Sequence, residues 1–85
     1  MDKLEQSINR GKEAQRLLAD PVLVEAFERL EAAYTAEWKQ SEFLDVNRRE
    51  SAFRMFTAMG DLKRQIEAFV TDGRISEDKL KRQKL

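Results

Sequence analysis

An apolar stripe along residues 45–72 limits the possible folds of this chain more than any other feature. Its members recur at steps of three and four, the spacing that lines up side chains on one face of an α-helix: Ala52, Met55, Met59, Leu62, Ile66 and Phe69. A helix of this length measures about 40 Å. One short neighbour cannot cover it, so the pattern predicts a long helix against which other helices pack.

Capping signals set the bounds of two helices that precede this stretch. Asp2 and Glu5 form a D-x-x-E pair, typical of a helix start, and predict a helix over 3–19. The dipeptide Asp20-Pro21 ends that helix, because the residue before a proline is disfavoured in the helical region. Proline is well tolerated at the first helical position, so a second helix is expected over 21–40.

The long helix itself is expected over 46–72. Asp45 is its predicted N-cap, and Gly73 is predicted to end it in the left-handed conformation. Gly60 could divide the helix, but the apolar stripe keeps its phase through this residue, which favours one continuous helix. In the short link before it, Phe43 and Leu44 are expected to tuck under Trp38.

These segments predict an all-α fold, a long antiparallel helical hairpin with a shorter N-terminal helix packed across it as a three-helix bundle. Residues 1–73 would form a single domain, and 74–85 a basic tail that is flexible or a short helix. Gly11 lies on the apolar face of the first helix, where it is either a tolerated weak position or a point of close approach by a neighbouring backbone. The predicted core consists of Leu4, Ile8, Leu18, Leu23, Phe27, Leu30, Tyr34, Trp38, Phe53, Phe56, Met59, Ile66 and Phe69.

Composition excludes several classes of function. The chain has neither Cys nor His, which removes disulfides, thiolate ligands, the commonest metal ligand and the commonest general base. The serines therefore have no histidine to activate them, and we predict no enzymatic activity, no catalytic residue, no cofactor and no metal. No apolar run approaches the ~18 residues of a membrane span, and no signal peptide begins the chain, so a cytoplasmic protein without a membrane partner is expected.

The best indication of function is a surplus of large apolar side chains over what three thin helices can cover. Either the first helix covers both others, or the surplus faces another protein molecule. We predict a non-catalytic protein–protein interaction or assembly module, a homodimer or higher homo-oligomer, whose interface includes Met55, Met59 and Leu62. The 16 basic and 16 acidic residues balance, but residues 74–85 carry five basic side chains against two acidic ones. The alternative function is therefore nucleic-acid binding through Arg74, Lys79, Lys81, Arg82 and Lys84.

The block from Arg10 to Phe27, RGKEAQRLLADPVLVEAF, is followed by Trp38, Asp45, Arg49-Glu50 and Asp72-Gly73. In these features the chain, up to Gly73, resembles a family of small helical proteins that tailed bacteriophages and prophages encode, often near head and packaging genes. The resemblance implies a phage origin and a role in virion assembly or host takeover, in the host cytoplasm or the virion. It implies no enzymatic activity and no site residues.

Overall fold

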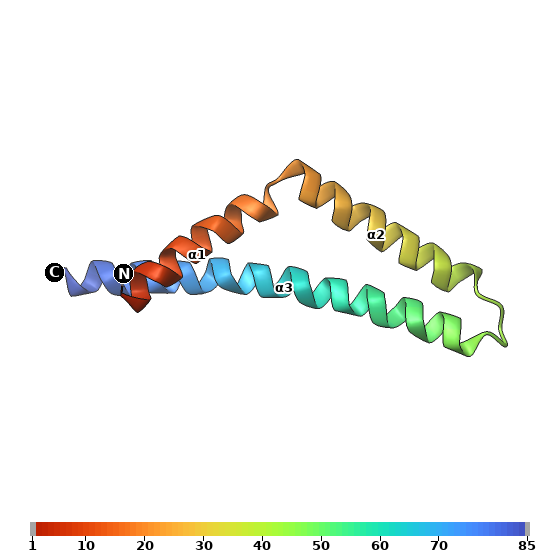
Figure 1. The fold of residues 1–85 in the computed structure, drawn as a ribbon. Coiled ribbons are helices and arrows are strands. Elements are labelled where there is room, and N and C mark those ends of the chain that lie inside the picture. Colours follow the sequence, from red (N-terminus) through yellow and green to blue (C-terminus); the bar gives the residue numbers. More distant parts are fainter. Residues whose placement is uncertain (1, 85) are drawn as a thin grey trace. The chain divides into compact units, whose positions relative to one another are not determined.

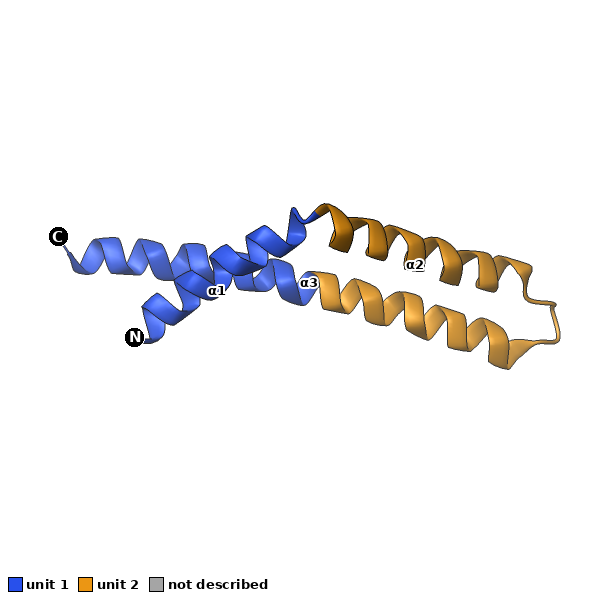
Figure 2. Ribbon diagram, turned by 45° about the horizontal axis from the view of Figure 1, so that its top comes forward, with its two compact units in different colours: residues 1–20, 64–85 blue, residues 21–63 orange. Residues whose placement is uncertain are grey.

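The computed structural model describes residues 2–84 of the chain, most of which are helical. The three helices are α1 (Lys3–Leu18), α2 (Pro21–Gln40) and α3 (Val46–Gln83), and no strand occurs within residues 2–84 (Figure 1). The helices form two compact units, coloured separately in Figure 2. In one unit α1 packs against residues 64–83 of α3, and in the other α2 packs against residues 46–63. The predicted all-α fold of three helices is confirmed.

The predicted helix starts are confirmed in detail. The carboxylate of Asp2 accepts a hydrogen bond from the backbone N–H of Glu5 at 2.8 Å, which satisfies a donor that the first turn leaves unpaired. Pro21 is the first residue of α2. Asp45 caps α3 by accepting from the backbone N–H of Arg48 at 3.2 Å. Gly60 lies inside α3, so the prediction of one unbroken helix there is also confirmed.

The predicted end of α3 at Gly73 is wrong, because α3 continues to Gln83 and no glycine within residues 2–84 has a positive φ. Gly73 instead faces Gly11 where α1 crosses α3. A Cβ built on Gly11 would lie 2.9 Å from the Gly73 Cα and 2.9 Å from the Phe69 carbonyl oxygen. A Cβ on Gly73 would lie 3.0 Å from the Gly11 Cα. Both glycines are therefore needed for the close approach of the two backbones. This agrees with the second interpretation of Gly11, a point of close approach by a neighbouring backbone.

Small side chains form most of the core of this first unit. Ile8, Gly11 and Ala14 of α1 are buried, and so are Gly73 and Ser76 of α3. Because these residues are small, the backbones of the two helices approach closely at this crossing. Residues 74–83, predicted as a separate tail, thus take part in the packing of α1.

The second unit has almost no buried residues. Within residues 21–63, all of which the structure describes, only Ala52 is buried, and α2 has no buried residue. The predicted core is wrong for four of its members, which are exposed: Leu30, Trp38, Phe53 and Phe56. Two helices side by side share a single line of contact, here at Ala52, and the larger side chains flank that line on both sides. Of the predicted core, Ile8 alone is buried, and the remaining members are half-buried.

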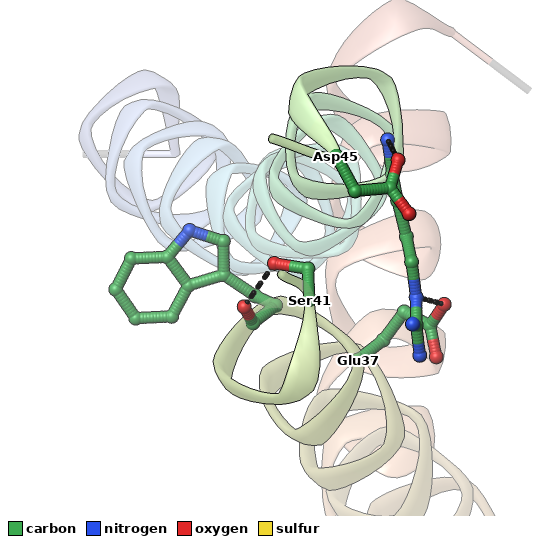
Figure 3. Close-up of polar contacts among 5 residues, drawn as sticks. Glu37, Ser41 and Asp45 are labelled. Atoms are coloured by element: carbon green, nitrogen blue, oxygen red, sulfur yellow. Dashed lines mark hydrogen bonds and ion pairs between the residues drawn. The ribbon is translucent and has the colours of Figure 1, made fainter. Parts of the chain in front are cut away.

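Side-chain hydrogen bonds fasten the turn between α2 and α3 (Figure 3). The Ser41 hydroxyl donates to the Trp38 carbonyl oxygen at 2.7 Å. One turn earlier, the carboxylate of Glu37 accepts from the Arg48 guanidinium at 2.5 Å, which ties the end of α2 to the start of α3. These contacts, with the Asp45 cap, fix the register of the hairpin.

The two large apolar residues of the turn are not covered. Phe43 is 85% exposed and Leu44 is 87% exposed, so the prediction that they tuck under Trp38 is wrong. The Arg49 guanidinium donates to the carbonyl oxygens of Glu42 and Phe43, at 2.9 and 2.6 Å, and lies over the Phe43 ring with its carbon 5.8 Å from the ring centre. Arg49 thus holds the turn in a conformation that keeps Phe43 outside the hairpin.

Candidate protein interface

An apolar groove runs along one side of the hairpin formed by α2 and residues 46–63 of α3. It has a volume of about 240 Å³, and its lining is almost entirely apolar. Its walls come from both helices: Tyr34, Thr35 and Trp38 from α2, and Ala52, Phe53 and Phe56 from α3. We refer to this feature as the aromatic groove.

The aromatic groove leaves much ring surface in contact with water. Phe53 is 62% exposed, Trp38 49% and Phe56 45%. Since aromatic side chains bury 150–250 Å² each when covered, these three leave roughly 300 Å² of aromatic surface exposed. Val46, 47% exposed, lines a neighbouring pocket with Trp38 and Phe53, and the same pocket also contains the charged side chains of Arg49, Glu50 and Arg54. The largest apolar patch on a typical monomeric protein is of about this size and is often functional.

The opposite side of the same hairpin is more polar. Its pocket is lined by Ala33, Tyr34, Glu37, Arg48, Ser51, Ala52 and Met55. The hydrogen bond from Arg48 holds the pKa of the Glu37 carboxyl below its ordinary value, and the same bond raises the pKa of Arg48. This side therefore carries a charged pair, whereas the residues that line the aromatic groove are all uncharged.

The predicted interface residues do not line the aromatic groove. Met55 and Leu62 are exposed, at 47% and 55%, and Met59 is half-buried. Met55 lines the pocket of the polar side. Around the axis of α3, Met55 and Phe53 lie on opposite sides of Ala52. The sequence pattern did not predict Trp38, Phe53 and Phe56 as candidate interface residues, because it assigned all three to the core. Helical spacing already places Phe53 and Phe56 on one side of Ala52 around the helix axis, and Met55 and Met59 on the other.

The five basic residues predicted as a nucleic-acid contact lie on the last turns of α3 or directly after it, and all are exposed: Arg74, Lys79, Lys81, Arg82 and Lys84. Two of them form ion pairs within the helix. Lys81 lies 3.7 Å from the Glu77 carboxylate, and Arg82 lies 3.0 Å from the Asp78 carboxylate. The acidic residues of the segment thus neutralise part of its positive charge.

Within residues 2–84 no three acidic side chains come together as metal ligands could. Every buried side-chain nitrogen or oxygen there has a hydrogen-bond partner. None of the three helices combines the length and apolar character that a membrane crossing requires.

Comparisons of the chain with protein-family models, with curated proteins and with solved structures found no match. The family resemblance drawn from the residues between Arg10 and Gly73 therefore stays a prediction, and the function rests on the surface of the molecule itself.

Proposed function

We propose that this protein is a non-catalytic interaction or assembly module that binds protein through the hairpin of α2 and residues 46–63. The observation that supports the proposal is the aromatic groove, with Phe53 62% and Trp38 49% exposed beside an almost uncharged lining. Phage origin, with a role in virion assembly or host takeover, is part of the same proposal and follows from the family resemblance.

A partner on the aromatic groove would contribute a free energy comparable to the stability of a small domain. At about 25 cal/mol per Å², covering roughly 300 Å² of aromatic surface would contribute on the order of 7 kcal/mol before the cost of association. Small domains have a total stability of only about 5–15 kcal/mol. A hairpin with one buried residue gains little from its own interior, so a partner on the aromatic groove would stabilise it substantially. Self-association is the simplest source of such a partner, since closed dimers are the commonest homo-oligomers.

Light scattering on the full chain at micromolar concentration tests whether the protein forms a homo-oligomer. The chain has a mass of 10.0 kDa, so a dimer has about twice that mass. We expect Phe53→Gln to return the mass to that of a monomer. Ile75→Gln is the matched control, because Ile75 is also an exposed apolar residue of α3, at 51%, but lies outside the hairpin. Gln is a good helix former, so neither change should disturb α3 itself.

Each outcome of this experiment assigns the interface. A parent that scatters as a monomer at all concentrations would contradict self-association. A dimer that survives Phe53→Gln but is lost on Met55→Gln would place the interface on the polar side, where the sequence predicted it. A complex with DNA that weakens steeply with salt, and is lost when Lys79 and Lys84 become Gln, would instead support nucleic-acid binding through counterion release.

A further inference from the structure

We infer that a second copy of this chain covers the aromatic groove with its own, and that α2 of each copy then lies against residues 46–63 of the other. This inference rests on the proposed function and adds to it the occupant of the groove and the orientation of the pair.

The size of the face fits a dimer interface. A 20-residue helix such as α2 is about 30 Å long, and two helices side by side are about 20 Å wide. A face of these dimensions covers roughly 600 Å², so two copies would bury about 1,200 Å² in total, the lower end of the range for stable interfaces. Besides the three aromatic residues, it includes Val46 at 47% and Val24 at 38% exposure, and Val24 lies four helical turns before Trp38. Two such hairpins packed face to face would form a four-helix bundle, which encloses a core that one hairpin lacks.

The distribution of charge agrees with this face rather than the other. The Glu37–Arg48 ion pair lies on the polar side, where a dimer contact would have to desolvate it. Pairing through the aromatic groove leaves that ion pair in water and covers an almost wholly apolar lining. A contact that reaches Val46 also meets Arg49, Glu50 and Arg54.

The charge of the two helices also selects an orientation. Leaving out the Glu37–Arg48 pair of the polar side, α2 contains three glutamates against Arg29 and Lys39, whereas residues 46–63 contain three basic side chains against Glu50 and Asp61. A two-fold axis parallel to the helices would place α2 of one copy beside residues 46–63 of the other, so opposite charges meet. A two-fold axis across the helices would place α2 against α2, so like charges meet, which is unfavourable. The first arrangement brings the two 41–45 turns to the same end of the bundle.

The separation of the two turns is therefore the decisive quantity. The chain has no cysteine, so Leu44→Cys, at a position that is 87% exposed, introduces a single thiol for a spin label. With turns at the same end and neighbouring helices 8–10 Å apart, the labels should lie within roughly 25 Å. With turns at opposite ends, the length of the helices adds about 30 Å along the axis and the distance exceeds roughly 35 Å. Pulsed electron paramagnetic resonance on the labelled full chain distinguishes the two distances.

The possible results separate this inference from the proposed function. A short distance that disappears in Leu44→Cys/Phe53→Gln supports the orientation and the groove together. A long distance in a dimer overturns the orientation but leaves the proposed function standing. A labelled chain that scatters as a dimer and keeps its distance in the Phe53→Gln background overturns the groove as the contact. A chain with no dipolar signal and the mass of a monomer overturns the second copy as occupant.

Discussion

Replacing Gly11 with alanine perturbs the contact at which α1 and α3 touch. In an open helix interior this change is stabilising by about 1 kcal/mol, because alanine restricts the unfolded chain and favours the helix. Here the new Cβ would lie 2.9 Å from both the Gly73 Cα and the Phe69 carbonyl oxygen, where ordinary contacts are 3.4–4 Å. Both opposing atoms belong to the backbone of α3, so no side chain can rotate away and the two helices must separate.

The magnitude follows from two opposing terms. Overpacking of this kind costs about 1–3 kcal/mol, and the separation also weakens the dispersion contacts of Ile8 and Ser76 on either side. After subtraction of the helix-propensity gain of about 1 kcal/mol, we expect Gly11→Ala to lower the free energy of unfolding by up to about 2 kcal/mol. In a chain of this size each kcal/mol lowers the thermal midpoint by roughly 4–8 °C, measured by far-UV circular dichroism.

Gly60→Ala is the control for this prediction. Gly60 lies in the same helix α3 but outside the unit in which α1 and α3 cross, so alanine there should raise the midpoint through helix propensity. Gly73→Ala should act in the same direction as Gly11→Ala, because its Cβ would meet the Gly11 Cα at 3.0 Å and the Ser7 carbonyl oxygen at 3.1 Å. If Gly11→Ala raised the midpoint as Gly60→Ala does, the close crossing of the two helices would be refuted.

Two further predictions concern the hairpin. Asp45→Ala removes the cap of α3 and should destabilise the protein by about 1 kcal/mol in chemical denaturation, whereas Asp45→Asn should recover most of the loss. The hydrogen bond from Arg48 lowers the pKa of Glu37 in the folded state, so the pair stabilises the fold above the ordinary glutamate pKa of about 4.3 and ceases to do so as the pH falls through the lowered value. The difference in thermal midpoint between the parent and Glu37→Gln should therefore be present at neutral pH and shrink below about pH 4, and a difference unchanged down to pH 2 would contradict this ion pair.

The starts of the helices were predictable because each has a local cause. The carboxylates of Asp2 and Asp45 bind backbone donors within three residues of themselves, and Pro21 acts on its own segment. The end of α3 was not predictable in the same way. Gly73 resembles a helix stop when only its neighbours in sequence are considered, and its actual cause is Gly11, which is 62 positions away in the chain. A glycine in the apolar stripe of each of two helices was the available signal for a close crossing.

The apolar character of the candidate interface could be predicted from the sequence, but the side of the hairpin on which it lies could not. The surplus of large apolar residues is a property of composition, and the exposed Trp38 and Phe53 agree with it. Which side of the hairpin they occupy depends on the rotation of α3 about its own axis, and that rotation follows from the packing of Ala52 between the two helices. A stripe widened to include both Phe53 and Met55 hides this distinction, because the two residues lie on opposite sides of Ala52.

Trp38 offers the most direct test of the claim that another copy covers the aromatic groove. It is the only tryptophan of the chain, it lines the groove, and it is 49% exposed in the single chain. Its fluorescence should be recorded in a dilution series together with the mass from light scattering. We predict that the emission shifts to longer wavelength and becomes more accessible to acrylamide over the same concentration range in which the mass falls from that of a dimer to that of a monomer. A mass that falls while the emission and quenching of Trp38 stay constant would contradict the account, because the copies would then meet elsewhere.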